Sequence, residues 1–259
     1  MGTLQRLVFC LQHSDGFRRL SRPFDDTIRN LVFRTPRILA GPMRGLYYGS
    51  GDGDRSVLLG TYEPGVQQAM RDVLKKGHVF YDIGANAGYF SLLGATLVGP
   101  EGHVYAFEPL PQNGERLKKT MEENQVRNYT LVMQAVNDAS GTRALYLGDG
   151  NQRRASLLPW KGEARTFVDT ITLDQFVRDD NWPNLIKLDV EGAEIQVLQG
   201  GRRVLSDERA PIWIIEIHSE KNDRAAGELL DAHQYRMTRR AQENRKGRRY
   251  PLHMIASRE

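Results

Sequence analysis

The segment VFYDIGANAGYFS, residues 79–91, contains the features from which the fold of this chain can be predicted. Its first five residues are mostly β-branched or aromatic, which predicts a buried strand over 79–83. Gly84 and Gly88 then allow a tight turn and a close approach of the backbone to a ligand before a helix begins. This spacing differs from the G-x-G-x-x-G of dinucleotide sites, and the carboxylate of Asp82 would repel a pyrophosphate. The turn therefore predicts a small-molecule site for a ligand that carries positive charge.

A second apolar run, HVYAFEPLP at residues 103–111, predicts another strand, which ends at Glu108. The helix-like stretch 88–98 separates the two runs, so together they predict a βαβ unit. An acid at the end of the second strand is placed to accept hydrogen bonds from ribose hydroxyls. S-adenosylmethionine has a ribose and a positive charge but no phosphate. We expect its sulfonium and α-amino groups near Asp82 and its ribose near Glu108.

Three motifs carry a resemblance to a known family: DIGANAG at 82–88, IKLDVEGAEIQVLQGG at 186–201 and IWIIEIHSE at 212–220. They resemble motifs of the FkbM family of class I methyltransferases, which is named after a polyketide O-methyltransferase. The match runs from about Leu39 to the end of the chain. The resemblance implies an α/β fold of three layers, with a Rossmann-like, mostly parallel seven-stranded sheet and an antiparallel C-terminal strand. It also implies methyl transfer from S-adenosylmethionine to a hydroxyl of a sugar, polyketide or other secondary metabolite, without indicating which.

The predicted cofactor site combines residues from several segments. Besides the two strand ends, the resemblance adds Glu63, although an acid before a proline more often begins a helix. A third strand predicted over 130–136 would end beside the adenine, or would simply be a buried strand end. The candidate cofactor-binding residues are Glu63, Asp82, Gly84, Asn86, Gly88, Glu108, Pro109, Ala135, Val136 and Asp189.

The candidate catalytic residues are Asp189, Glu216 and His218. Alternation along NLIKLDVEGAE places Lys187 on the same side as Asp189, and alternation along IIEIHSE places Glu216 on the same side as His218. Ligands of open α/β sheets bind at the carboxyl ends of the strands. His218 is the expected base for the acceptor hydroxyl, with an ordinary pKa near 6.5.

Two alternatives to a direct base stay open at this point. Asp189, Glu216 and His218 could instead bind Mg²⁺, which would orient and acidify the hydroxyl. His218 could also be a hydrogen-bonded histidine at a strand end with no chemical role. Lys187 is expected to pair with an acid, and Glu194 is explained by the favourable position of an acid at a helix N-terminus.

Length and composition predict one catalytic domain with an N-terminal extension. A chain of 259 residues with 40% hydrophobic content can bury a large core. We expect a helical and loop extension over residues 1–60 and a class I methyltransferase domain over 61–259. The extension would cover the active site or pack on a sheet edge. The single cysteine, Cys10, excludes an internal disulfide, and no apolar run approaches the ~20 residues of a membrane span. These features predict a cytoplasmic protein without a membrane partner, and they leave a homo-oligomer open.

Segments 142–148 and 166–173 predict further strands around a loop whose Arg153, Arg154 and Ser156 are candidate acceptor contacts, although a solvated loop is the safer interpretation. The chain ends in two predicted antiparallel strands around a basic loop. The basic residues of this C-terminal region are Arg236, Arg239, Arg240, Arg245, Lys246, Arg248 and Arg249. They could protect an exposed hairpin edge or contact RNA phosphates. Because no aromatic platform accompanies them, a small-molecule acceptor is favoured over RNA methylation. A non-catalytic scaffold that binds the cofactor is the other alternative.

Overall fold

The computed structural model describes residues 36–49, 55–148, 155–159, 165–241 and 251–258 of the chain. The chain divides into two compact units, Met1–Tyr62 and Glu63–Glu259. In the described part of the first unit, Arg37 and Tyr47 form an antiparallel bridge, and helix α4 spans Arg55–Leu58. The predicted helices of residues 1–35 lie outside the described residues, so the N-terminal extension stays a prediction.

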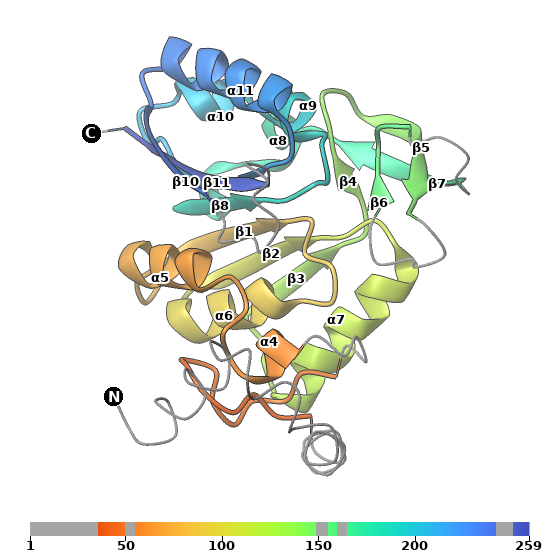
Figure 1. Cartoon of the computed structure of the whole chain (residues 1–259), viewed down its shortest axis with the longest axis vertical. Helices are drawn as coiled ribbons and strands as arrows, with labels where there is room; N and C mark the ends of the chain where they lie inside the picture. Colours follow the sequence, from red (N-terminus) through yellow and green to blue (C-terminus); the bar gives the residue numbers. More distant parts are fainter. Residues whose placement is uncertain (1–35, 50–54, 149–154, 160–164, 242–250, 259) are drawn as a thin grey trace, which may run out of the picture. The chain divides into compact units, whose positions relative to one another are not determined.

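The second unit is built around a sheet of seven strands within the described residues, in the order β10-β11-β9-β8-β1-β2-β3 (Figure 1). The strands are β1 (Val79–Ile83), β2 (His103–Phe107), β3 (Tyr129–Val132), β8 (Leu185–Leu188), β9 (Ile212–Ile217), β10 (Arg236–Ala241) and β11 (Leu252–Ser257). β1 pairs in parallel with β2 and β8, and β11 pairs antiparallel with both β9 and β10. The predicted fold class, a mostly parallel sheet with an antiparallel C-terminal strand, is confirmed.

Helices cover both faces of this sheet, as Figure 1 shows, and make the unit three-layered. On one face lie α5 (Pro64–Val73), α6 (Tyr89–Val98) and α7 (Pro111–Glu123). On the other lie α8 (Leu173–Phe176), α9 (Glu194–Gln199), α10 (Arg202–Ser206) and α11 (Glu220–Ala232), with a 3₁₀ turn at Asp179–Asn181.

Strand alternation decides which side chains meet which helices. Tyr81 and Ile83 of β1 belong to the core shared with α8–α11. Phe80 instead packs closely on α6, because a Cβ added to Gly94 of that helix would lie 2.3 Å from the Phe80 ring. The same alternation sends Trp213 and Ile215 of β9 into the α8–α11 core. The intervening residues of β1, β8 and β9 therefore face α5 and α6.

The strand predicted over residues 130–136 is wrong in its length. β3 ends at Val132, and Ala135–Val136 forms a separate strand, β4, in a second sheet. The two paired strands end at the same register position, because Phe107, the last residue of β2, lies opposite Val132, the last residue of β3. Beyond that point the chain has no β2 partner, and it bends into the other sheet.

The second sheet has four strands in the described residues, in the order β4-β7-β5-β6. Besides β4 they are β5 (Gly141–Leu147), β6 (Ala155–Ser156) and β7 (Arg165–Ile171), so the two further strands predicted here are confirmed. Their small core contains Ala135, Leu145 and Val168 together with Leu110, which follows the end of β2. The second sheet is thereby anchored to the loop that carries Glu108.

The predicted C-terminal strand pair is confirmed as the antiparallel β10 and β11. The connecting residues 242–250, which include Arg245, Lys246, Arg248 and Arg249, lie outside the described residues. Among the residues that the structure describes, no helix combines the length and the apolar character that crossing a membrane requires.

Candidate active site

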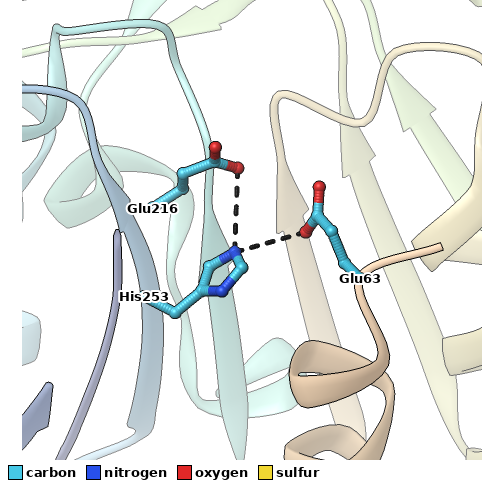
Figure 2. Close-up of side chains that lie close together, drawn as sticks. All are labelled: Glu63, Glu216 and His253. Atoms are coloured by element: carbon cyan, nitrogen blue, oxygen red, sulfur yellow. Dashed lines mark ion pairs between the residues drawn. The ribbon is translucent and has the colours of Figure 1, made fainter. Parts of the chain in front are cut away.

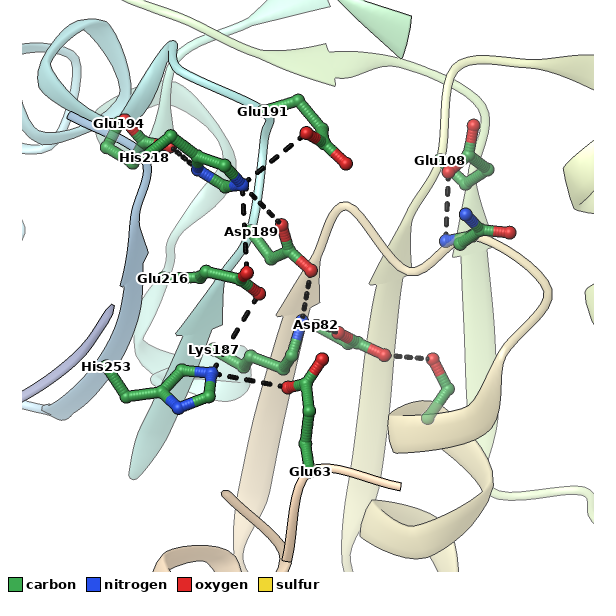
Figure 3. A network of polar contacts seen from close by, with 12 residues as sticks. Glu63, Asp82, Glu108, Lys187, Asp189, Glu191, Glu194, Glu216, His218 and His253 are labelled. Atoms are coloured by element: carbon green, nitrogen blue, oxygen red, sulfur yellow. Dashed lines mark hydrogen bonds and ion pairs between the residues drawn. The ribbon is translucent and has the colours of Figure 1, made fainter. Parts of the chain in front are cut away.

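Polar side chains gather on the α5–α6 face of the sheet, at and beyond the carboxyl ends of β1, β8 and β9 (Figure 3). Alternation places them there, because Asp82 and Lys187 are register partners on β1 and β8. Glu216 of β9 is in turn the register partner of His253 on β11. The network consists of Glu63, Asp82, Lys187, Asp189, Glu191, Glu194, Glu216, His218 and His253.

Lys187 lies at the centre of this network and is only 3% exposed. Its Nζ is 3.2 Å from Asp189 Oδ2 and 4.0 Å from Asp82 Oδ1, and it lies 4.9 Å from the ring centre of Phe90. Burial disfavours the ammonium, but the charges of Asp189 and Asp82 outweigh it and raise the pKa of Lys187. Lys187 is therefore a paired structural cation, as predicted, which holds the ends of β1 and β8 together.

Asp82 is enclosed within the protein, with 1% of its surface exposed. Its Oδ2 accepts a hydrogen bond of 2.6 Å from Ser91 Oγ on α6. Burial raises the pKa of this carboxyl, while Lys187 and Ser91 act against that rise. The structure thus places Asp82 among protein partners, and its contact with a sulfonium or an amino group stays a prediction.

Asp189 continues the same side of β8 as Lys187, as the sequence predicted. Its backbone N–H donates to Ile83 O at 3.0 Å, which fixes the end of β8 against the end of β1. Although burial opposes it, the positive charges of Lys187 and His218 lower the pKa of the Asp189 carboxyl. Asp189 is therefore ionised and faces both cations.

His218 has different surroundings at its two ring nitrogens. Nδ1 lies 2.7 Å from Glu194 Oε1, within hydrogen-bonding distance. Nε2 faces three carboxylates at longer distances: 3.5 Å to Glu191, 3.8 Å to Glu216 and 3.9 Å to Asp189. Burial would lower the pKa of the imidazole, but the hydrogen bond to Glu194 and the nearby negative charges raise it to about 9. The ring is consequently protonated at neutral pH, which corrects the ordinary value near 6.5 used above.

Glu194 was not among the predicted site residues, although the structure makes it the partner that orients His218. It is fully buried and also accepts hydrogen bonds from the Gly192 N–H at 2.8 Å and from Asn222 Nδ2. A helix-dipole role is therefore only part of its function. No local sequence pattern indicates the pair, because the contact joins residues 24 positions apart, on α9 and just after β9.

A second group of side chains, Glu63, Glu216 and His253, lies close together in Figure 2. His253 Nε2 lies 3.3 Å from Glu63 Oε2 and 3.9 Å from Glu216 Oε2. Glu63, directly before α5, has a left-handed backbone with φ 41°, which is uncommon for a non-glycine residue. Burial, together with the charges of Asp189 and Glu63, raises the pKa of Glu216 to about 9. His253 was missed, because only the register of the antiparallel β11 places it opposite Glu216.

Two sets of three side chains could coordinate a metal ion. Asp189, Glu216 and His218 form one, and Glu63, Glu216 and His253 form the other, each with its ligand atoms within 4.8 Å of one another. The first set is the one predicted from sequence. Carboxylate and imidazole donors suit several divalent ions. The structure brings the ligands together, and the binding of an ion stays a prediction.

Glu108 is the residue predicted to bind the ribose of the cofactor. Its carboxylate accepts hydrogen bonds from the N–H groups of Asn86 and Leu110, both at 2.9 Å, and from Asn113 Nδ2 at 3.3 Å. Burial raises its pKa to about 7 against the effect of these three donors. A carboxylate has about four acceptor positions, so one remains for a ribose hydroxyl. Asn113 Oδ1 is also buried and has no hydrogen-bond partner among the described residues, so it offers a second acceptor.

The remaining predicted cofactor residues are placed as follows. Gly84 has φ 83°, and a Cβ there would lie 1.8 Å from Asp189 O, so the turn packs directly on the end of β8. Gly88, with φ 86°, packs on Leu117 of α7. Pro109 is half-buried beside Glu108.

Asn86 is left-handed, with φ 49°, and its N–H donates to Glu108. Ala135 packs in the small core with Leu110, and Val136 packs in the main core. The adenine contact proposed for Ala135 and Val136 stays a prediction.

Comparison with known proteins gives the following matches. The family model of the methyltransferase FkbM domain matches residues 82–245. The hexuronic acid methyltransferase AglP of Haloferax volcanii is 26% identical over 174 residues, which cover 64% of this chain and 68% of that protein. A protein-L-isoaspartate O-methyltransferase of Ignicoccus hospitalis is 35% identical over 60 residues, which are 23% of this chain and only 28% of that relative's length. A Clostridium thermocellum structure, provisionally described as an rRNA methylase, superposes with a TM-score of 0.50 at 12% identity, over 76% of this chain and 96% of that one.

The strand order and the glycine turn after β1 are those of the Rossmann-like fold that class I methyltransferases share. The solved structure supports the fold alone, at its low identity. Because the family model matches well over half of the residues, the chain belongs to the FkbM methyltransferase family, as its three motifs predicted.

Proposed function

We propose that this protein transfers a methyl group from S-adenosylmethionine to a hydroxyl of a sugar, a polyketide or another small molecule. Membership of the FkbM family supports the reaction class. The relative described as a hexuronic acid methyltransferase supports a carbohydrate-type acceptor. The second half of the proposal, oxygen as the methylated atom, rests on His218.

The geometry of His218 is the observation that carries this proposal. Both carboxyl oxygens of Glu194 accept hydrogen bonds from N–H groups, Oε1 from Gly192 and Oε2 from Asn222. We therefore assign Nδ1 of His218 as the donor of the 2.7 Å contact to Oε1. Once the ring loses its other proton, the free lone pair is on Nε2, which faces Asp189, Glu191 and Glu216 at the strand ends. A base held in one tautomer at the carboxyl end of a parallel sheet can remove the proton of an acceptor hydroxyl.

The residues present fit the cofactor. S-adenosylmethionine supplies an electrophilic methyl group when bound. Glu108, with one acceptor position left, and Asn113, with its free Oδ1, would accept hydrogen bonds from the nucleoside. The anionic Asp189 would favour a cationic ligand at the other end of the site.

A divalent ion is the alternative to a direct base. Asp189, Glu216 and His218 would then hold Mg²⁺, and the ion would orient and acidify the hydroxyl. We favour the direct base, because the Nδ1 contact to Glu194 holds the ring in the required tautomer without an ion. The two versions diverge when a chelator is added.

The test follows labelled methyl transfer from S-adenosylmethionine to p-nitrophenyl glucoside, p-nitrophenyl glucuronide and total RNA. If His218 is a direct base, turnover survives EDTA and falls ~10²- to 10⁴-fold in His218→Ala. The control His233→Ala changes a histidine at the end of α11 and should keep the wild-type turnover. With a metal, EDTA abolishes turnover, magnesium restores it, and Asp189→Asn is equally damaging.

Three outcomes would contradict parts of this proposal. Full activity in both His218→Ala and Asp189→Asn would exclude both versions. Methylation of RNA alone would contradict the small-molecule acceptor. Absence of calorimetric binding for both S-adenosylmethionine and S-adenosylhomocysteine at millimolar concentration would contradict the cofactor.

A further inference from the structure

Ser156 joins the second sheet to the turn that follows β8. It lies in the two-residue strand β6 and is 1% exposed. Its Oγ donates a hydrogen bond of 2.9 Å to Glu191 O and accepts one of 3.1 Å from the Leu158 N–H. Because the hydroxyl proton is used in the first of these bonds, Ser156 has no second proton to donate. The acceptor contact considered for Ser156 from sequence stays a prediction, and Arg153 and Arg154 lie outside the described residues.

The carbonyl that Ser156 holds belongs to a residue with an unusual backbone. Glu191 has φ 51°, in the left-handed region, and Gly192 follows with φ 108°. A non-glycine residue keeps such a conformation only when its surroundings determine it. Leu158 packs over the same turn, since a Cβ at Gly192 would lie 3.5 Å from Leu158 Cδ1. The segment 155–159 thus supplies both a hydrogen bond and an apolar contact to this turn.

The turn carries two of the carboxylates that face His218. Glu191 Oε2 lies 3.5 Å from Nε2, and Asp189, two residues earlier, lies 3.9 Å from it. On the other side, β6 is fixed by its pairing with β5, where Ser156 is the register partner of Tyr146. The pairing of β6 with β5 thus places the Ser156 hydroxyl and Leu158 against the turn.

We propose that Ser156 is a positioning residue for methyl transfer: its hydroxyl fixes the Glu191–Gly192 turn so that Asp189 and Glu191 keep their places at His218 Nε2. The inference rests on the proposed function, but it concerns a residue outside the predicted catalytic set. In this role Ser156 acts through the backbone of Glu191.

The experiment compares Ser156→Ala with Thr170→Val. Thr170 is a matched control, because it is also buried in the second sheet, and its hydroxyl hydrogen-bonds to the carbonyls of Ala139 and Gly141, away from the turn. Ser156→Thr keeps the hydroxyl and serves as the conservative rescue. For each protein we would measure the melting temperature, the affinity for S-adenosylhomocysteine, kcat for labelled methyl transfer, and the titration of the His218 ring by NMR in EDTA.

In Ser156→Ala we expect kcat to fall about 10- to 100-fold, because small misplacements at a reacting centre have effects of this size, with unchanged affinity for the nucleoside ligand. The titration midpoint of His218 should also fall, because a carboxylate near the protonated ring stabilises it and the variant lacks the hydrogen bond from Ser156 to Glu191 O. Ser156→Thr should restore both. Thr170→Val should lower the melting temperature and leave kcat and the midpoint unchanged.

Two results would overturn the inference. One is a Ser156→Ala protein with the wild-type midpoint and wild-type kcat. The other is an equal loss of both in Thr170→Val, which would show a merely structural role. If the wild type transfers no methyl group at all, the proposed function fails, but the NMR titration, which needs neither acceptor nor cofactor, still decides the role of Ser156.

Discussion

Replacing Glu194 by glutamine should move the pKa of His218 toward its ordinary value. The structure raises this pKa from 6.5 to about 9, which corresponds to roughly 3 kcal/mol in favour of the protonated ring, since one pKa unit is about 1.4 kcal/mol. The hydrogen bond to Glu194 is the largest contribution that raises it. Glutamine keeps the size and one acceptor oxygen but removes the charge, so we expect the pKa to fall by about 1 to 3 units.

The assay is a pH titration of the His218 ring by NMR, in EDTA, on protein labelled at histidine. Asp174→Asn is the control, because Asp174 also accepts hydrogen bonds, from the N–H groups of Arg203 and Val204, but it lies outside the network around His218. In that variant the His218 midpoint should not move. An unchanged midpoint in Glu194→Gln would refute the assignment of Glu194 as the group that sets the protonation of His218.

The same substitution should cost stability, which a urea titration measures separately. Glu194 accepts hydrogen bonds from the Gly192 N–H, from Asn222 and from His218, so the NH₂ of a glutamine must face a donor. One unsatisfied buried group costs about 1 to 3 kcal/mol. A variant that loses this stability but keeps the wild-type midpoint would show that Glu194 supports the turn without controlling the imidazole.

The remaining predictions concern pH, the cofactor and the turn after β1. Because Nε2 of His218 must be neutral to act as a base, kcat/KM should rise with pH toward about 9; an acid limb near 6.5 would contradict this. The raised pKa of His218 contributes to the free energy of unfolding. This contribution should be fully present below pH 6.5 and lost as the pH rises through about 9, and thermal unfolding across that range checks it. Glu108→Gln should weaken S-adenosylhomocysteine binding by ~1–3 kcal/mol in calorimetry, and unchanged affinity in a folded variant would contradict the ribose placement. Gly84→Ala should lower stability by more than ~2 kcal/mol, since its Cβ would lie 1.8 Å from Asp189 O; a wild-type urea midpoint would show that the turn relaxes freely.

Strand periodicity was enough to predict much of the fold and part of the site. The run before Gly84 and the run before Glu108 are short and apolar, and together with the helix between them they allow only a parallel βαβ unit. Period-two alternation placed Lys187 beside Asp189 and Glu216 beside His218, and the contacts at 3.2 Å and 3.8 Å agree. These are local relations, because each depends on residues two positions apart on one strand.

Other features depended on the tertiary structure, since they join segments that no local pattern connects. The pairing of Glu194 with His218 depends on how α9 packs beside the end of β9, and the place of His253 depends on the register of β11. The separation of Ala135 and Val136 from β3 depends on where β2 ends. Burial, which no short sequence window specifies, raises the pKa of Glu216 to about 9. Against the effect of burial, the hydrogen bond to Glu194 and the neighbouring negative charges, which only the tertiary structure brings together, raise the pKa of His218 to about 9.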